Sequence, residues 1–473
     1  MMTTTRSLSI SKLVEKVTTG ECTATQLVVD AYKKIEQYDE YNAVLSVNTD
    51  RAFLRAEEID RKIQNGENVG KLAGVPFLAK DNFLTLGGTT TAASRFLENF
   101  NAPLQATAIE KLEAEGAICI GKTNLDAFAH GGSTENSAYG VTKNAFDTQR
   151  VAGGSSGGSA VSVALDIVPF ALGTDTGGSI RQPADFNGVV GLKPTYGAVS
   201  RYGVVAMASS TDCIGPITRC CEDSELVMSV LAGKDTRDGT TRPDFFQPLK
   251  TTKKLTIGII KECLNENVDS DVQQAVREYS KKLEAAGHTV KEVELPMTQY
   301  AIAMYYVIIP AEISSNLARY DGVRYGERAD NSSLDRLYGE SRDKGFMSEN
   351  KRRLLIGSYV LSSGYYDAYY LKAQKARTLL IDQYNKLFKQ CDVLLSPTSP
   401  TPAFTIGELA NDAMKMYMAD AMTVPPSLAG LPAVSLPYTR NDDGLPIGVQ
   451  LIGDYESDAL LLSLGKQMET FNG

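Results

Sequence analysis

The chain has 473 residues, of which 43% are hydrophobic, and its 48 Lys and Arg against 57 Asp and Glu give a net charge of −9. This acidic balance argues against a free-standing binder of nucleic acid or anionic membranes, which usually carries a basic surface. Only two histidines, His130 and His288, are present, so a multi-histidine metal centre is excluded and a Ser-His-Asp hydrolase would have only two candidate bases.

The cysteines and the apolar stretches both bear on the cellular location. Seven cysteines are scattered along the chain without a C-x-x-C pair, which argues against a disulfide framework or zinc site and favours a reducing cytosol. Residues 1–16 contain no apolar signal-peptide core, and the longest apolar stretch, 160–172, is interrupted by Asp166 and Pro169. It is too short to cross a bilayer. We therefore expect a soluble, cytoplasmic protein without membrane association.

The first seventy or so residues are expected to form a helical segment. Thr23 and Gln26 have the spacing of a capping box, and apolar residues follow at helical intervals. From Leu72 onward, short apolar runs alternate with helical patterns. We predict strands over 75–79 and 117–120 and helices over 106–115 and 159–165. This alternation predicts an α/β fold with a mixed, mostly parallel sheet covered by helices on both faces.

The second half of the chain resumes the same pattern after a polar connection over 235–254. The predicted elements are strands over 255–260, 392–395 and 433–436, a helix over 269–286 and a mostly helical, tyrosine-rich region over 299–389. No boundary between independent folding units is evident. We expect one domain over 1–473, consisting of a helical segment (about 1–70), a core (72–220) and a remainder of sheet and helices (about 255–473).

Residues 116–123 match the phosphate-loop pattern G-x-x-x-x-G-K-[ST] by letter, but their context differs. In a phosphate loop a strand precedes the first glycine and the intervening residues form the cradle. Here a helix precedes Gly116, and the intervening Ala-Ile-Cys-Ile are strand formers. We therefore expect Gly116 to end a helix and Lys122 to follow a strand, although a nucleotide-binding protein stays a weak alternative.

Three segments together suggest acyl-transfer chemistry. Lys80 directly follows an apolar strand, residues 153–159 form a Gly/Ser loop, and Ser179 follows two glycines where a helix could begin. A serine hydroxyl needs a base to become a nucleophile, and a buried lysine can stay neutral and serve as one. Lys80 as a surface lysine and Ser179 as a helix cap are the alternatives. The residues alone thus support only the hypothesis of a serine hydrolase with a lysine base.

The run from Gly153 to Pro194, together with Lys80, closely resembles the signature of the amidase family. This resemblance implies a Ser-cis-Ser-Lys catalytic set, in which Ser179 is the nucleophile, Ser155 is a bridging serine preceded by a cis peptide, and Lys80 is the base. The resemblance also implies an oxyanion hole made by the backbone amides of Thr176, Gly177, Gly178 and Ser179. In such a mechanism no histidine and no metal is needed.

Further blocks resemble one branch of the family, the glutamine-hydrolysing subunits of tRNA-dependent amidotransferases. These blocks lie at 315–326, 351–353, 362–370 and 396–402. The resemblance implies free glutamine as substrate, with Arg353 gripping its α-carboxylate and Asp420 its α-ammonium. Such a pairing is chemically reasonable because a free amino acid needs one fixed cation and one fixed anion near its Cα.

The branch also implies partners, the B and C subunits of the amidotransferase. Ammonia would pass to the B subunit, which would bind tRNA and use ATP and Mg²⁺, while the small C subunit would clamp the assembly. This chain itself would then hold no cofactor. Glu-tRNA(Gln) would become Gln-tRNA(Gln), and whether Asp-tRNA(Asn) is also served stays open. A stand-alone amidase of the same superfamily is the alternative.

Three positions depart from what the resemblance leads us to expect. Methionine is expected at His130, serine at Gly132 and asparagine at Ser427. His130 and Gly132 should lie near the glutamine pocket. We favour His130 as a tolerated core or loop substitution over a catalytic base, because Lys80 already fills that role.

Overall fold

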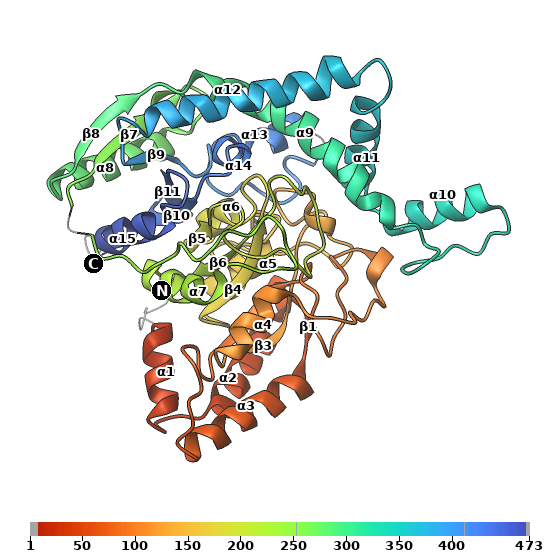
Figure 1. Cartoon of the computed structure of the whole chain (residues 1–473), viewed down its shortest axis with the longest axis vertical. Helices are drawn as coiled ribbons and strands as arrows, with labels where there is room; N and C mark the ends of the chain where they lie inside the picture. The colour runs from red at the N-terminus through yellow and green to blue at the C-terminus, as the bar shows by residue number, and fades with distance from the viewer. Residues whose placement is uncertain (1–7, 252, 411, 470–473) are drawn as a thin grey trace.

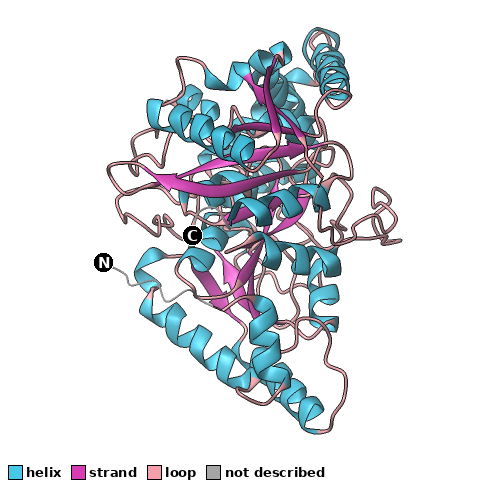
Figure 2. Cartoon of the chain, turned by 90° about the vertical axis from the view of Figure 1, so that its left-hand side faces the viewer, coloured by secondary structure: helices cyan, strands magenta, loops and turns pink. Residues whose placement is uncertain are grey.

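The fold is built around one mixed sheet. The computed structural model describes residues 8–251, 253–410 and 412–469. Eleven strands form the sheet in the order β1-β3-β2-β4-β6-β5-β10-β11-β9-β7-β8, and helices surround it in both views (Figures 1 and 2). The predicted α/β class with a helix-covered mixed sheet is thus confirmed.

The element bounds are as follows. The strands are β1 (Val44–Val47), β2 (Pro76–Lys80), β3 (Ile118–Thr123), β4 (Phe170–Asp175), β5 (Val190–Lys193), β6 (Cys213–Thr218), β7 (Thr256–Ile260), β8 (Thr289–Val293), β9 (Val393–Pro397), β10 (Ala433–Arg440) and β11 (Pro446–Gly453). The α-helices are α1 (Ile10–Thr18), α2 (Ala24–Gln37), α3 (Thr49–Gln64), α4 (Thr107–Ala114), α5 (Gly157–Ala164), α6 (Arg181–Phe186), α7 (Cys221–Leu231), α8 (Ser270–Ala285), α9 (Ala301–Asn316), α10 (Leu334–Gly345), α11 (Ser348–Val360), α12 (Lys372–Leu387), α13 (Ala413–Met418), α14 (Val424–Leu428) and α15 (Asp458–Glu469).

The sheet is less parallel than the sequence predicts. Four of the ten strand pairs are parallel, those of β2 with β3 and β4 and of β7 with β8 and β9. The centre, from β4 through β6, β5, β10 and β11 to β9, is antiparallel. A short connection between Arg440 and Pro446 makes β10 and β11 a hairpin, which can only be antiparallel. The alternation of strand and helix patterns in a sequence does not show which strands pair antiparallel.

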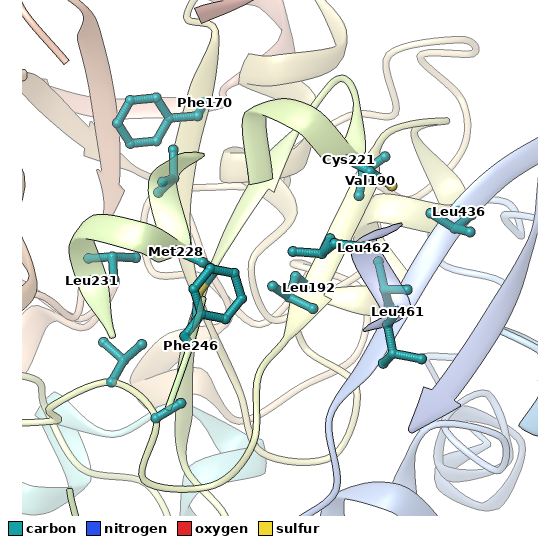
Figure 3. Close-up of a cluster of buried hydrophobic side chains, with 14 of the residues drawn as sticks. Phe170, Val190, Leu192, Cys221, Met228, Leu231, Phe246, Leu436, Leu461 and Leu462 are labelled. Carbon is teal, nitrogen blue, oxygen red and sulfur yellow. The ribbon is translucent and has the colours of Figure 1, made fainter. Parts of the chain in front are cut away.

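Apolar side chains alternate between the two faces of the sheet. In β2, Phe77 and Ala79 belong to one buried cluster and Leu78 to another, as the two-residue period of a strand requires. The first cluster lies under α7 and α15, and Figure 3 shows members from these helices, such as Met228 and Leu462, packed around strand residues. The second cluster includes side chains from helices α5 and α6. Burial on both faces explains why apolar residues predominate in the central strands.

Helix α9 packs against α11 and α12, and Figure 1 shows α12 along the top of the molecule with α9, α11 and α10 toward the right. The stretch Pro296–Arg319, which includes α9, is long and apolar enough to cross a membrane. Half of it is buried inside the protein, as expected for a core helix of a large domain. The burial accounts for its apolar composition without a membrane.

The phosphate-loop match at 116–123 has a structural role. Gly116 has a φ of +86° just past α4, so it ends that helix as predicted. Lys122 lies within β3 and is fully buried, and its Nζ is 2.8 Å from Asp81 Oδ1 and 2.7 Å from the Phe83 carbonyl oxygen. A lysine committed to a buried ion pair is not available to a phosphate. The nucleotide-loop alternative is therefore wrong.

Strand order brings the predicted site together. β2 and β4 are parallel neighbours, so their carboxyl ends meet at one edge of the sheet. Lys80 is the last residue of β2, and Thr174 lies at the same end of β4. Helix α5 begins at Gly157, within the Gly/Ser segment, and α6 begins two residues after Ser179. Three segments far apart in sequence thereby converge on one point.

Candidate active site

The side chain of Lys80 ends among three hydroxyl groups. It is fully buried, and its Nζ lies 2.8 Å from Ser155 Oγ, 2.9 Å from Ser156 Oγ and 2.9 Å from Thr174 Oγ1. No carboxylate is in direct contact with this amine among the residues that the structure describes. The family motif identifies Ser155, but Ser156 and Thr174 went unnoticed because serine and threonine carry no pattern of their own.

Burial makes Lys80 a base at neutral pH. Loss of hydration disfavours the ammonium form and lowers the pKa of Lys80 to about 7. The carboxylates of Asp126, Asp175 and Asp212 oppose this shift by favouring the charged form. An amine with a pKa near the working pH is well suited to take up and return a proton.

Hydrogen-bond directions are compatible with Ser155 as the hydroxyl that gives its proton to Lys80. Ser156 Oγ donates to the Thr174 carbonyl oxygen over 3.2 Å, so it accepts from Lys80. Thr174 Oγ1 accepts a further hydrogen bond from Asn82 Nδ2 over 3.1 Å. A neutral amine can therefore donate to Ser156 and Thr174 and direct its lone pair at Ser155. Ser155 is the group placed to donate.

The Gly/Ser loop is held in an unusual backbone geometry. The Gly154–Ser155 peptide bond is cis, and the Gly154 amide donates to Gln182 Oε1 over 2.9 Å. A Cβ on Gly154 would lie 2.2 Å from Asp126 Oδ2, which no other residue could accommodate. Glycine at this position lets the loop approach the buried carboxylate closely.

Ser179 lies beside this loop and is 9% exposed. Its carbonyl oxygen accepts the Ser156 amide over 3.1 Å, which ties the two serine-bearing loops together. Beneath it, Asp175 forms a fully buried ion pair with Arg181 at 2.9 Å. Although burial acts in the opposite direction, Arg181 lowers the pKa of Asp175. Its carboxylate therefore stays charged and fixes the turn before α6.

The four backbone amides that the resemblance points to are not equivalent. The Gly178 amide donates to Asp175 Oδ1 over 2.8 Å and is occupied. The amides of Thr176, Gly177 and Ser179 have no acceptor within the described part of the chain. These three are free to bind an oxyanion.

A cavity of about 200 Å³ lies next to the Gly/Ser loop. Asp126, whose carboxylate abuts Gly154, lines it together with Gly132, Tyr306, Arg353 and Asp420. A cavity of this size holds a molecule with only a few heavy atoms. The two residues expected to bind glutamine thus share one cavity beside the serine loop.

Arg353 presents a free cationic group to this cavity. The residue is 3% exposed, its Nε donates to Glu349 Oε1 over 2.8 Å, and its guanidinium lies 5.3 Å from the centre of the Tyr306 ring. Burial disfavours its charge, but Tyr306 and Glu349 raise the pKa of Arg353 above its ordinary value. Its two terminal nitrogens have no partner in the described structure. They form the planar fork that binds a carboxylate with two hydrogen bonds.

Asp420 is the counterpart of Arg353 in the same cavity. The residue is half-buried between α13 and α14, and among the described residues its carboxylate accepts no hydrogen bond. Burial raises the pKa of Asp420 to about 8, although Arg353 acts in the opposite direction. A carboxylate this poorly solvated gains much from a bound cation. The cavity therefore fits a small zwitterion.

His130 is a buried structural residue. It is fully buried, and its Nδ1 lies 2.7 Å from Asn350 Nδ2, while the same amide nitrogen donates to the Ala127 carbonyl oxygen. Nδ1 accepts, so the ring is neutral with its proton on Nε2. Burial, and then Arg353, hold the pKa of His130 well below its usual value. No hydrogen bond links this ring to Lys80 or to the serines within the described residues.

Ser427 and Gly132, the other two positions that depart from the family resemblance, also have structural explanations. Ser427 Oγ accepts from Arg181 Nη2 over 2.7 Å and so supports the Asp175–Arg181 pair. Gly132 lines the cavity, and a Cβ there would lie 3.6 Å from Asp420 Oδ2, an ordinary contact distance. The glycine therefore leaves space beside Asp420.

Among the described residues, no three His, Cys, Asp or Glu side chains are grouped to hold a metal ion.

Comparison with known proteins agrees with this geometry. The sequence model of a family described as Amidase matches residues 26–462. The A subunit of glutamyl-tRNA(Gln) amidotransferase from Microcystis aeruginosa is 50% identical over 452 residues, covering 94% of both chains. The protein of that name from Geobacillus thermodenitrificans is 48% identical over 468 residues, covering 98% of this chain and 96% of its own. The crystal structure of the glutamyl-tRNA(Gln) amidotransferase A subunit from Thermotoga maritima is 38% identical, with a TM-score of 0.80, covering 99% of this chain and 96% of that one.

Proposed function

The chain belongs to the amidase family, and from this premise we propose that it is the glutaminase subunit of a tRNA-dependent amidotransferase. It hydrolyses glutamine and supplies ammonia for the conversion of Glu-tRNA(Gln) to Gln-tRNA(Gln). One observation carries the choice of substrate. The guanidinium of Arg353, with two unpaired terminal nitrogens, and the carboxylate of Asp420, unpaired among the described residues, line one small cavity beside the lysine–serine site.

Proton transfer in this proposal runs through Ser155. Neutral Lys80 accepts the Ser155 proton across the 2.8 Å contact as Ser155 takes the proton of Ser179. Ser179 Oγ then attacks the side-chain amide carbon of glutamine and forms a tetrahedral intermediate. The proton returns from Lys80 through Ser155 to the departing ammonia, and water cleaves the acyl-enzyme to give glutamate. Because the pKa of Lys80 is low, the amine can both accept the proton and give it back near neutral pH.

The oxyanion of the intermediate would be bound by amides of the loop after β4. Thr176, Gly177 and Ser179 supply donors that are unoccupied within the described chain, whereas Gly178 serves through its hydrogen bond to Asp175, which fixes the turn. Donors held in place before the reaction stabilise the developing charge without reorganisation.

Substrate recognition would rest on charge at both ends of the glutamine Cα. Arg353 binds the α-carboxylate through its two terminal nitrogens, and Asp420 binds the α-ammonium. Amides that lack this zwitterionic head leave both charged groups unpaired, which disfavours their binding. This is the physical reason for preferring glutamine over the diverse amides of a stand-alone amidase.

The partners follow from the role. We place the chain in a cytoplasmic heterotrimer with the B and C subunits, in which the B subunit is the one that binds mischarged tRNA and uses ATP and Mg²⁺. The acidic net charge of −9 suits a subunit that leaves tRNA contact mainly to its partner. Asp-tRNA(Asn) is a second acceptor that the same ammonia source could serve.

The test is reconstitution of the purified chain with the B and C subunits. Glutamine, ATP, Mg²⁺ and Glu-tRNA(Gln) should yield Gln-tRNA(Gln), and the Ser179→Ala variant should yield none unless free ammonia is added. Failure of the wild-type assembly to use glutamine would refute the proposal. Rapid hydrolysis of diverse amides by the lone chain, unaffected by Arg353→Ala, would favour a stand-alone amidase.

A further inference from the structure

Asp212 contacts the loop that holds the oxyanion donors from outside the substrate cavity. Thr176 Oγ1 donates to Asp212 Oδ1 over 2.7 Å. The other oxygen, Asp212 Oδ2, accepts the amides of Met207 at 2.9 Å and Ala208 at 3.0 Å. Both carboxylate oxygens are therefore occupied, and the side chain has a single defined orientation.

The sheet register places these two residues opposite each other. β4 and β6 are antiparallel, with Asp175 opposite Cys213. Thr176 directly follows β4 and Asp212 directly precedes β6. The hydrogen bond thus extends the pairing of two central strands by one step into the catalytic loop, and it transmits the rigidity of the sheet to the Thr176 backbone.

Asp212 does not belong to the substrate cavity. It lines a second cavity of about 210 Å³ together with Asn82, Thr174, Arg201 and Asp238. The two cavities have no lining residue in common. Asp212 would therefore influence the reaction only indirectly, through its hydrogen bond to Thr176 and through the electrostatic effect of its charge on Lys80.

We propose that Asp212 is a positioning residue, which holds the Thr176–Ser179 loop in the conformation that binds the oxyanion. Its carboxylate also acts on the charge of the Lys80 amine. The inference rests on the proposed function of Ser179 and Lys80. Of the three carboxylates that act on the Lys80 amine, Asp126 accepts the Thr134 amide of another loop and Asp175 accepts the Gly178 amide at the base of the same loop, whereas Asp212 holds the loop from β6 through the Thr176 hydroxyl. The groups facing Asp212 itself are the Thr176 hydroxyl, the two amides and Arg201.

The variants separate these two effects. Thr176→Val removes the hydroxyl at constant shape, Thr176→Ser keeps it, and Asp212→Asn removes the charge. Asp238→Asn is the matched control, because Asp238 lines the same second cavity but pairs with Arg201 over 3.0 Å. Thermal unfolding of each variant identifies any that fails to fold, and the near-isosteric Thr176→Val keeps the inference testable if Asp212→Asn does.

The main readout is the rate at which a fluorophosphonate modifies Ser179. In this reaction the Ser179 Oγ–P bond forms, fluoride leaves, and the phosphonyl oxygen occupies the oxyanion site. It needs the nucleophile, the base and the loop, but not glutamine. A chain that reacts with the probe, but whose assembly with the B and C subunits does not use glutamine, would refute the proposed function and leave this inference open to the same test.

We expect Thr176→Val and Asp212→Asn each to slow labelling about tenfold or more, since small displacements of catalytic groups have effects of this order. The double variant should be no slower than the slower single variant, because both changes act through the same contact between Asp212 and Thr176. Thr176→Ser, which keeps the hydroxyl, should label faster than Thr176→Val, and the control Asp238→Asn should label within about threefold of wild type. In glutamine hydrolysis the loss should appear in kcat and not in KM.

The pH profile provides the second readout. The rise of the labelling rate with pH should move to lower pH in Asp212→Asn, because a negative charge near Lys80 has been removed. Thr176→Val should move it less, because Asp212 keeps its carboxylate and loses only a hydrogen bond that lowers its pKa. Independent losses that multiply in the double variant, or wild-type rates in both single variants, would overturn the proposal. If Asp212 only stabilised the fold, the pH dependence of the labelling rate would be the same in Asp212→Asn as in wild type.

Discussion

Glu349 Oε1 accepts a hydrogen bond from Arg353 Nε over 2.8 Å, one turn apart on α11. The same carboxylate accepts from Arg352 over 2.6 Å and from the Tyr417 hydroxyl over 3.2 Å. Three contacts fix Glu349, and Glu349 in turn leaves only the terminal nitrogens of Arg353 free. The orientation of the cationic fork is therefore set before a ligand arrives.

The first prediction concerns this carboxylate. Glu349→Gln should raise KM for glutamine about tenfold with little change in kcat, because a neutral amide holds Arg353 less firmly and binding of the α-carboxylate loses precision. Steady-state hydrolysis of glutamine measures both constants. Glu294→Gln, at an exposed ion pair with Lys261, is the control and should behave like wild type. An unchanged KM in Glu349→Gln would argue against the orienting role.

The second prediction links the stability of the fold to the catalytic base. The pKa of Lys80 lies near 7 in the folded chain against an ordinary value of 10.5, so between these values the unfolded chain binds more protons. The stability of wild type should therefore rise with pH relative to Lys80→Met, by about 1.4 kcal/mol per pH unit across that window. Chemical unfolding of both proteins from pH 7 to pH 10 measures the difference.

Lys80→Met should also have no measurable glutaminase activity, whereas in wild type kcat should fall as the pH drops through about 7. Lys80→Arg provides the matched control, since its side chain stays charged and cannot act as a base. A stability difference that does not change with pH would mean that Lys80 is charged in the folded protein.

The third prediction concerns Asp420, whose pKa of about 8 leaves it partly protonated at neutral pH. A bound ammonium stabilises the carboxylate, so glutamine binding should release a proton. KM should therefore increase as the pH falls from 8 to 6. In Asp420→Asn, KM should be at least about tenfold higher and independent of pH over this range. A pH-dependent KM in that variant would assign the effect to another group.

The fourth prediction is that His130 serves the fold and not the reaction. His130→Met should keep kcat within about threefold and leave the pH profile unchanged, because the imidazole touches neither Lys80 nor a serine. It should lower the free energy of unfolding by about 1–3 kcal/mol, since Asn350 loses its acceptor in the interior. If kcat of His130→Met no longer fell as the pH drops through about 7, this assignment would be contradicted.

Local patterns predicted much of the fold. Strand and helix signals at 75–79, 106–115 and 255–260 match β2, α4 and β7 to within a residue or two. Six strands were missed, which are β1 within the helical segment, the buried β4, β5, β6 and β11, and β8. β1 is short and partly exposed, and β4 contains Gly173 and Asp175, which are poor strand formers. Their pairing is set by tertiary contacts that no local window contains.

The site was predictable where a residue is tied to a motif and not elsewhere. Lys80, Ser155 and Ser179 stand within a recognisable signature, and the structure brings Lys80 and Ser155 into contact. Thr174, Asn82 and Asp212 carry no such signal, because their contribution depends on strand register. The sequence also does not show that the Gly178 amide is unavailable to an oxyanion, because this depends on its hydrogen bond to Asp175. A sequence gives residue types, whereas hydrogen-bond occupancy requires coordinates.

The strand order also bears on synthesis of the chain at the ribosome. Lys80, Ser155 and Ser179 are all made early, but β5 pairs on one side with β10, which is more than half of the chain away. Until residues 433–440 emerge, one edge of β5 has no neighbour, and exposed strand edges invite pairing between molecules. A nascent chain therefore carries its nucleophile and base long before its sheet is closed. We expect prematurely terminated products to aggregate and not to hydrolyse amides indiscriminately.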